Sequence, residues 1–359
     1  MPTPSLAGGR VLVTGGAGFI GTTLARELAD RAEEWVVLDS LHPQVHPGSL
    51  APTDLPGSVD LRVGDVTSAD DLDAVVADLR PDTVVHLAAE TGTAQSLDES
   101  TRHGMVNVVG TTQLLDSFTR AGHVPSHFVL TSSRAVYGEG VWRNADGSTF
   151  QPGLRTHAQL EAGSWDHGDG AAHVPNTVDG THPNPINVYG ATKLAQEQIL
   201  SAWTGSRDTR LSILRLQNVY GPRQSLSNPY TGIVSLFSRM AREGQSIPLY
   251  EDGDITRDFV YIDDVVDALV AAIARKPADH VRIVDVGSGV RTTIGDLARE
   301  IAAYHSAPAP HVTGQYRDGD VRHASCDVEA TLRQLDWRPR VSLRDGIAEL
   351  QRWIATQLE

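Results

Sequence analysis

A tyrosine and a lysine stand four residues apart in Tyr189-Gly-Ala-Thr-Lys193, a spacing that can do proton chemistry. On a helix, this spacing places the phenol and the ammonium on one face. The ammonium should favour the phenolate and lower the pKa of Tyr189 towards neutrality, which makes it a usable acid or base. The same pair is also common on solvated helices, so its meaning depends on the elements that position it.

Ser133 is the third candidate, because it follows an apolar run in Thr131-Ser-Ser-Arg-Ala-Val-Tyr137. The carboxyl edge of a parallel sheet is where such folds bind ligands. The alternative is a serine that only caps the backbone at a strand end. We interpret Ser133, Tyr189 and Lys193 together as the catalytic residues.

Short β-branched runs alternate with helical patterns along the chain, and most of these runs are apolar almost throughout. That pattern predicts strands covered on both faces, in a parallel, doubly wound sheet. The expected strands are Val11–Thr14, Trp35–Asp39, Leu61–Gly64, Thr83–Leu87, His127–Thr131, Leu211–Leu216 and Arg282–Val286. Between them, Ser68 is expected to cap a helix whose buried positions are Leu72, Val75, Val76 and Leu79.

Two segments interrupt this rhythm. Gly138–Pro185 is rich in Gly, His, Asp and Asn and weakly periodic, and we interpret it as an insertion over the surface. After Leu216 the chain becomes irregular, and it closes with a helix from Leu343 to about Leu358, capped by Ser342 and buried through Ile347, Leu350 and Ile354.

The fold class expected is therefore α/β: a Rossmann-type doubly wound parallel sheet with a smaller C-terminal α/β substrate-binding domain. We assign residues 1–216, joined by about 258–288, to the dinucleotide domain. Residues 217–257 and 289–359 form the substrate domain.

The run Val11-Leu-Val-Thr-Gly15-Gly-Ala-Gly18-Phe19-Ile20-Gly21 predicts a strand, a glycine turn and a helix start. Gly15 permits the tight turn, Gly18 lets the backbone approach a pyrophosphate, and Gly21 lets the helix pack on the strand. Asp39 ends the second strand, where a carboxylate accepts from ribose hydroxyls and repels a 2′-phosphate. NAD is therefore favoured over NADP, and a purely structural turn is the lesser alternative.

Further residues at strand ends are candidates for the cofactor site. Asp65 and Val66 follow the third strand, where the adenine would lie, and small residues after the fourth strand would let the cofactor approach closely. The remaining candidates are Leu87, Ala88, Ala89 and Asn107, with Phe19, Ile20, Tyr189 and Lys193.

Composition excludes several other classes of protein. The formal net charge is −15 and the pI about 5.3, which argues against nucleic acid and against an anionic membrane surface as partners. The single cysteine, Cys326, excludes an internal disulfide and fits a reducing compartment. The start of the chain, Met1–Gly9, lacks a signal-peptide pattern, and Asp267 interrupts the most apolar run. We expect a cytoplasmic protein.

The chain resembles the extended short-chain dehydrogenase/reductase family, in its sugar-nucleotide epimerase/dehydratase branch. The resemblance covers nearly the whole length. It is carried by Gly15-Gly-Ala-Gly-Phe-Ile-Gly21, His86-Leu-Ala-Ala89, Ser133 before Val136-Tyr-Gly138, Tyr189 with Lys193, Asn218-Val-Tyr-Gly-Pro222 and Arg257-Asp-Phe-Val-Tyr-Ile-Asp-Asp264.

The resemblance implies a nucleotide-sugar substrate, a UDP-, dTDP- or GDP-linked hexose, and a homodimer formed by the helices near Leu97–Thr119 and after Tyr189. It implies that Asn218, Arg257 and Arg317 bind the diphosphate, which suits guanidinium groups in an acidic protein. The other substrate-binding candidates are Thr91, Ser133, Arg134, Tyr189 and Asp320. Glu90 and Gln95 lie in the same loop as Thr91 and face either the sugar or solvent.

In 4,6-dehydratases of this branch the hydroxyl residue is followed by Asp-Glu, and in the decarboxylases a glutamate takes the second place. Here Arg134 and Ala135 follow Ser133, so elimination lacks its proton carriers. We therefore favour NAD-dependent 4-epimerisation through a 4-keto intermediate. The alternatives are a 4-ketoreductase, then a dehydratase or decarboxylase, and a non-catalytic dinucleotide-binding protein.

The chain also resembles a subgroup of bacterial 4-epimerases of deoxysugar nucleotides such as dTDP-L-rhamnose. The residues that carry it are Asp39–His46, Ala89–Thr93, Ser133–Gly140, Gln217–Pro222 and Asn228–Ile233. His157, His167 and His173 lie in the insertion without thiols or a tight spacing. We expect them to be solvated loop residues, and we expect no metal site.

Overall fold

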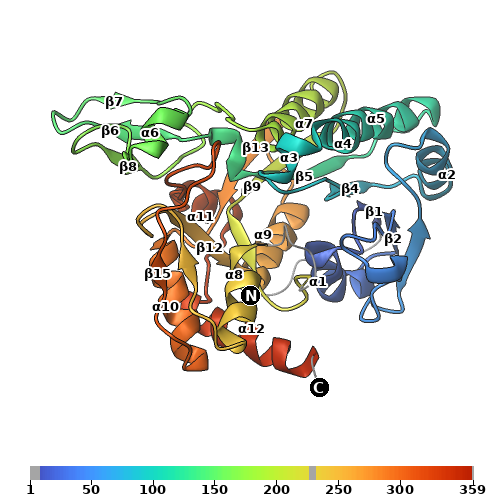
Figure 1. Cartoon of the computed structure of the whole chain (residues 1–359). Coiled ribbons are helices and arrows are strands. Elements are labelled where there is room, and N and C mark those ends of the chain that lie inside the picture. The colour runs from blue at the N-terminus through green and yellow to red at the C-terminus, as the bar shows by residue number, and fades with distance from the viewer. Residues whose placement is uncertain (1–8, 226–231, 358–359) are drawn as a thin grey trace.

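The computed structural model describes residues 9–225 and 232–357. At its centre is a seven-stranded parallel sheet with the order β13-β9-β5-β4-β1-β2-β3 (Figure 1). Its strands are β1 (Arg10–Thr14), β2 (Glu34–Asp39), β3 (Val59–Val63), β4 (Thr83–His86), β5 (His127–Ser133), β9 (Arg210–Leu216) and β13 (Val281–Val286). All seven expected strands lie in this sheet. The last of them pairs with β9 in the register Val281↔Leu211 to Val286↔Leu216.

Helices cover both faces of the sheet, as the apolar strands require. One face packs against α2 (Ala69–Leu79), α5 (Gly110–Arg120) and α7 (Val188–Thr204). The other packs against α1 (Phe19–Leu28) and α9 (Ile262–Ala274). The expected cap of α2 is confirmed, since the Ser68 hydroxyl accepts from Asp71 N, and its four expected apolar residues are buried. The doubly wound fold class is thus confirmed.

The residues after β9 build a second layer. Its sheets are β10-β12-β14, made of β10 (Asn218–Tyr220), β12 (Thr256–Tyr261) and β14 (Arg291–Thr293), and β11-β15, made of β11 (Pro248–Leu249) and β15 (His311–Val312). Its helices are α8 (Ile233–Arg242), α10 (Ile294–His305), α11 (Glu329–Leu335) and α12 (Leu343–Gln357). The Ser342 cap and the buried face of α12 are as expected. Leu358 lies outside the described residues, as do residues 1–8 of the segment Met1–Gly9 and residues 226–231, which include most of Asn228–Ile233. We propose the domain division given above.

The insertion at 138–185 is more ordered than its composition indicates. It forms an antiparallel sheet, β7-β6-β8, from β6 (Val141–Arg143), β7 (Thr149–Phe150) and β8 (Ala172–Val174), with α6 (His157–Glu161) beside it. Figure 1 shows this green segment projecting beside the orange and red C-terminal part of the chain. Weak periodicity concealed it, because two of the strands have only three residues and the third has two.

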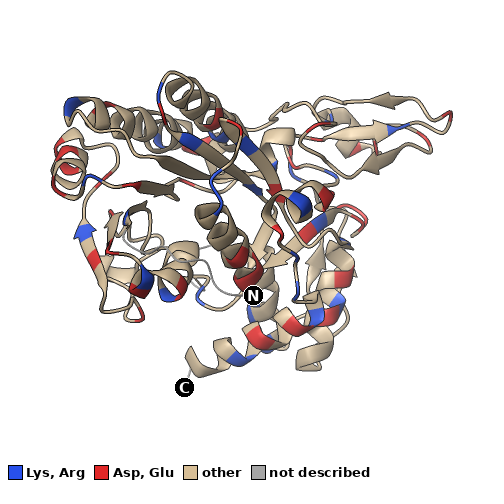
Figure 2. Ribbon diagram, turned by 180° about the vertical axis from the view of Figure 1, so that it is seen from behind, with Lys and Arg blue, Asp and Glu red and all other residues tan. Residues whose placement is uncertain are grey.

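Several short helices complete the chain. They are η1 (Ala29–Arg31), η2 (Pro47–Ser49), α3 (Gln95–Asp98), α4 (Ser100–His103), η3 (Gly104–Val109) and η4 (Arg134–Tyr137). Lysine and arginine residues are dispersed among aspartate and glutamate residues in the view of Figure 2. Among the residues that the structure describes, no helix has the length and apolar character needed to cross a membrane.

Candidate active site

The glycine turn has the close contacts that a dinucleotide site requires. Gly15 has φ +69°, and a Cβ there would lie 2.6 Å from the backbone of Ala88. A Cβ on Gly21 would lie 2.4 Å from Gly16 O. At Gly18, the N-cap of α1, no side chain caps the helix, so its first N–H groups and the positive end of its dipole are available to an anion.

Asp39 lies where the ribose would bind. Its carboxylate accepts from Ala17 N at 3.0 Å and from Leu41 N at 2.9 Å, and His46 lies 3.8 Å away. These bonds fix the carboxylate at the end of β2, beside the glycine turn. An acidic group held here repels a 2′-phosphate, so these residues fit NAD.

The other predicted cofactor residues lie at the same sheet edge in different settings. Phe19 and Ile20 start α1, and Leu87, Ala88 and Ala89 follow β4, all half-buried. Asp65 is exposed and bonds to Thr67 N, whereas Val66 is buried against Gly110. The amide of Asn107 bonds to both backbone groups of Glu90 and to the Thr192 hydroxyl, so it ties the loop after β4 to α7.

The structure brings Ser133 and Tyr189 together. Ser133 ends β5, and Tyr189 lies in the first turn of α7, whose N-cap Asn187 accepts from Gly190 N at 2.8 Å. The Ser133 hydroxyl lies close enough to the Tyr189 phenol to lower its pKa, and Ser133 Oγ also accepts from Ala135 N at 3.1 Å. Gly190 is required at this point, because a Cβ there would lie 2.5 Å from Ala135 O.

Lys193 is one turn further along α7 and is buried. Its Nζ donates to Gln196 Oε1 at 2.5 Å, and Gln196 Nε2 donates to the Thr111 hydroxyl at 2.8 Å. No carboxylate bonds to it among the described residues. Burial lowers the pKa of Lys193 to about 7, although Glu197 opposes the change.

The expected lowering of the Tyr189 pKa by Lys193 is wrong for this structure. Burial raises the pKa of Tyr189 above its ordinary value, and the opposing influences are the Ser133 hydrogen bond and the charge of Arg134. Sequence spacing places the ammonium on the same helix face, but it does not indicate that the ammonium will donate a hydrogen bond to Gln196.

Candidate substrate residues converge from three elements. Arg134 Nε donates to Asn218 Oδ1 at 2.8 Å, which joins η4 to β10. Burial, together with the charge of Arg257, lowers the pKa of Arg134 to about 9, while Asp320 and Tyr189 oppose this. The guanidinium of Arg134 thus lies close enough to Arg257, Asp320 and the Tyr189 phenol for their charges to influence it. Arg317 is exposed, with its guanidinium 5.0 Å from the ring centre of Tyr250.

The loop after β4 contributes less than its sequence suggested. Thr91 is exposed, and its carbonyl accepts from His103. Glu90 forms an ion pair with Arg102 at 2.8 Å. The buried amide of Gln95 bonds to Gln44 and Glu99, so it does not face solvent.

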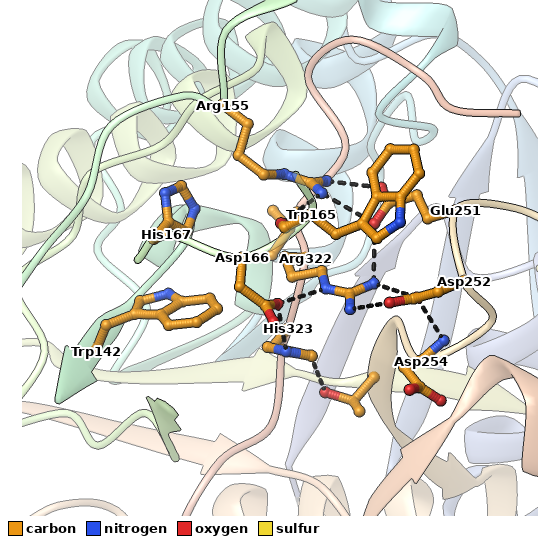
Figure 3. A network of polar contacts seen from close by, with 12 residues as sticks. Trp142, Arg155, Trp165, Asp166, His167, Glu251, Asp252, Asp254, Arg322 and His323 are labelled. Carbon is orange, nitrogen blue, oxygen red and sulfur yellow. Dashed lines mark hydrogen bonds and ion pairs between the residues drawn. The ribbon is translucent and has the colours of Figure 1, made fainter. Parts of the chain in front are cut away.

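The sequence interpretation missed a buried charged network that joins the insertion to the substrate domain (Figure 3). Arg155 binds Glu251 through two parallel bonds of 2.9 Å. Arg322 binds Glu251, Asp252 and Asp166 at 2.7–3.0 Å. Single Arg and Glu residues in loops give no periodic signal, so no pattern in the chain predicted this pairing.

Of the three insertion histidines expected in solvent, His157, His167 and His173, two are not solvated, which corrects that expectation. The rings of His167 and His173 pack on buried Trp142, with centroids 4.9 and 6.1 Å from its ring, as does His323. Burial lowers the pKa of His173 to about 3, so it is neutral at pH 7. His157 is exposed, as is His182 at the end of the insertion. No metal-binding group of three His, Cys, Asp or Glu side chains occurs among the described residues.

Comparisons with known proteins agree with this geometry. Residues 11–287 match the model of the NAD dependent epimerase/dehydratase family. A dTDP-L-rhamnose 4-epimerase of Burkholderia thailandensis is 56% identical over 98% of this chain and 96% of its own length. The structure of a Thermotoga maritima UDP-glucose 4-epimerase with UDP-glucose superposes with a TM-score of 0.80, at 26% identity, over 97% of this chain and 99% of that one.

A Thermus thermophilus UDP-glucose 4-epimerase solved with NAD superposes with a TM-score of 0.75, at 26% identity, over 96% of this chain and 99% of that one. The glycine turn and Asp39 are the features of this chain that fit the same cofactor. The chain therefore belongs to the NAD dependent epimerase/dehydratase family, and it is an NAD-dependent 4-epimerase of nucleotide-activated sugars.

Proposed function

We propose that this enzyme interconverts dTDP-L-rhamnose and its C4 epimer. The observation that carries the substrate is the 56% identity, over almost the full length of both chains, to a dTDP-L-rhamnose 4-epimerase. The site is compatible with this, because Arg134, Asn218 and Arg257 can meet the diphosphate while Ser133 and Tyr189 meet the sugar.

In the proposed mechanism, NAD held by the glycine turn and Asp39 would supply the acceptor and donor of a hydride at the sugar C4. Tyr189 acts as the phenolate, the form that the Ser133 hydroxyl and the charge of Arg134 favour, and takes the proton from the sugar O4 as C4 becomes a ketone. Ser133 hydrogen-bonds the same oxygen. The ketone then turns within the site while the diphosphate stays bound. Tyr189 gives its proton back to O4 after C4 is reduced on its other face. Lys193, one turn further along the same face of α7, would hold the nicotinamide ribose.

The substrate assignment is tested with the NAD-containing enzyme and no added cofactor. We expect dTDP-L-rhamnose to reach an equilibrium mixture of two C4 epimers, identified by NMR after chromatography, with UDP-glucose and a GDP-hexose turned over far more slowly. Stoichiometric consumption of added NADH would indicate a 4-ketoreductase instead.

The acid–base role is tested by Tyr189→Phe. Loss of the phenol should lower kcat by about 10²- to 10⁴-fold, the range for general acid–base catalysis, while NAD stays bound. A Phe variant with full turnover would contradict the mechanism.

We also propose that the enzyme is a cytoplasmic homodimer that pairs through α5 and α7. Leu97 and Met105, before α5, are exposed apolar side chains, and the single cysteine is buried and free. Light scattering coupled to size-exclusion chromatography should give twice the mass of the 38.6 kDa chain. A monomer at micromolar concentration would contradict this assembly.

A further inference from the structure

We propose that the insertion, through Arg155 and Glu139, positions the arginine that binds the substrate diphosphate. The residue positioned is Arg257, and the inference rests on the proposed function, in which Arg257 meets the diphosphate. Arg155 and Glu139 act as positioning residues, since their partners are protein groups.

Arg257 is held by backbone carbonyls. Its Nη1 donates to Thr256 O at 2.8 Å and to Arg322 O at 3.3 Å, and its Nη2 donates to Val321 O at 2.8 Å. Two of these three carbonyls belong to the segment 320–322, which is not part of a strand. The direction in which the guanidinium points is therefore set by where that segment lies.

The insertion fixes this segment on both sides of Val321. Arg155 Nη2 donates to Asp320 O at 2.8 Å. The Glu139 carboxylate accepts from Arg322 N, with its two oxygens 3.2 and 3.0 Å away. The groups just before and just after Val321 are thus bound by side chains that precede and follow the insertion strand β6.

Both insertion side chains are themselves fixed. Arg155 is buried, and besides Asp320 O it binds Glu251 by a fork and Trp165 O at 3.1 Å, as Figure 3 shows for Glu251. The Glu139 side chain is fully buried, with Arg155 Nε 3.6 Å and His167 Nε2 3.4 Å from its carboxylate. A forked, buried guanidinium holds its partners in one geometry, which is what a positioning role requires.

A guanidinium held in place binds a diphosphate better than one that must first be ordered. Loss of the insertion contacts should therefore weaken binding of the nucleotide half of the substrate. The chemical step should change little, because Ser133, Tyr189 and Lys193 lie on β5 and α7 and make no contact with Arg155 that the structure records.

The test measures binding of free dTDP and UDP to the NAD-containing enzyme by calorimetry, together with kcat, KM and NAD content. For Arg155→Met we expect Kd for dTDP and KM for the sugar nucleotide to rise by about tenfold or more, with kcat within about threefold of wild type. Arg155→Lys keeps the charge but cannot span Glu251 and Asp320 O together, so its Kd should be intermediate. If the methionine variant does not fold, the Kd of the lysine variant for dTDP tests the inference.

His157→Ala is the matched control. His157 also joins the insertion to the chain just before the segment 320–322, through exposed Asp318 at 3.1 Å. Its Kd should equal that of wild type. If wild type binds dTDP and the Arg155 variants bind it equally well, the inference is wrong while the proposed function stands. Equal losses of kcat, NAD and dTDP binding would also overturn it, as a general folding defect. A wild type that binds neither nucleotide would overturn the proposed function itself.

Discussion

Two buried polar networks serve this site, and they are built in opposite ways. Beneath Lys193 the partners are uncharged: His86 Nδ1 lies 2.6 Å from Thr14 Oγ1, His86 Nε2 lies 2.9 Å from Thr111 Oγ1, and Gln196 completes the chain. Burial lowers the pKa of His86 to about 3, so this chain stays neutral at pH 7. The one ammonium in it has no counter-charge bonded to it.

The network of the insertion consists of paired charges. Arg155 and Arg322 share Glu251, and Asp252 and Glu139 bind on either side. Each carboxylate has an arginine partner within 4 Å, and both arginine side chains are almost wholly buried. Such pairs cost desolvation, but removal of one partner leaves a buried charge uncompensated.

The difference shows how burial serves two purposes in one protein. A neutral surrounding leaves the charge of Lys193 adjustable, since a small change in its environment moves its pKa by whole units. Paired charges instead fix geometry, because each partner can be satisfied in only one arrangement. In the proposed function, the first network supports the proton chemistry and the second positions the substrate.

The largest effect is expected from a variant that breaks the charged network of the insertion. Arg322→Met leaves Glu251, Asp252 and Asp166 without a shared cation, so the free energy of unfolding should fall by about 3–5 kcal/mol. Urea unfolding followed by circular dichroism measures this. A loss below about 1 kcal/mol would mean that the buried pairs contribute no more than surface pairs.

The next prediction introduces a charge into the neutral network. In Gln196→Glu a carboxylate replaces the amide that accepts from Lys193, so the pKa of Lys193 should rise from about 7 by about one to two units. The chain has only two lysines, Lys193 and Lys276, so ¹³C-labelled lysine gives two titrating signals. Lys276→Arg assigns them. An unchanged titration would show that Gln196 does not control this ammonium.

A third prediction concerns Asp285, a buried carboxyl in β13. Its carboxyl accepts from the Tyr137 hydroxyl at 2.9 Å, and burial raises its pKa from 3.8 to about 7. Between these values the folded chain holds a proton that the unfolded chain has released, so stability falls as pH rises from about 4 to about 7. Asp285→Asn removes this dependence.

The comparison is made by urea unfolding at pH 5 and pH 8. Relative to wild type, the asparagine variant should gain on the order of 2 kcal/mol on going to the higher pH. Parallel pH profiles for the two proteins would place the folded pKa of Asp285 near its ordinary value.

The sheet was predictable because its physical signal is repeated. Most strands of the main sheet are apolar runs, and the glycine turn stands between the first of these strands and a helix, with Asp39 at the end of the second. The same holds for Tyr189 and Lys193, since helical spacing alone puts them on one face.

What could not be predicted depends on contacts between distant segments. Gln196 is an ordinary helix residue until Thr111 and His86 are brought beside it, 85 and 110 residues away in the chain. Arg155 likewise meets Glu251 and Asp320 O across 96 and 165 residues. His173 was expected in solvent because nothing local shows that Trp142 will cover it. The charge of a side chain alone does not indicate which groups will surround it once the chain has folded.

The smallest effect is expected from a variant that tests whether hydrogen-bond geometry or burial makes an ion pair stabilising. Arg120 binds Asp73 through a fork as good as any in the insertion network, with bonds of 2.7–2.9 Å, but both side chains are about half exposed. Water and salt screen this pair, and holding two long side chains costs conformational entropy. Arg120→Met should therefore leave the urea midpoint almost unchanged, at less than about a tenth of the shift caused by Arg322→Met. Comparable shifts for the two variants would mean that hydrogen-bond geometry, and not exclusion from water, makes the insertion network strong.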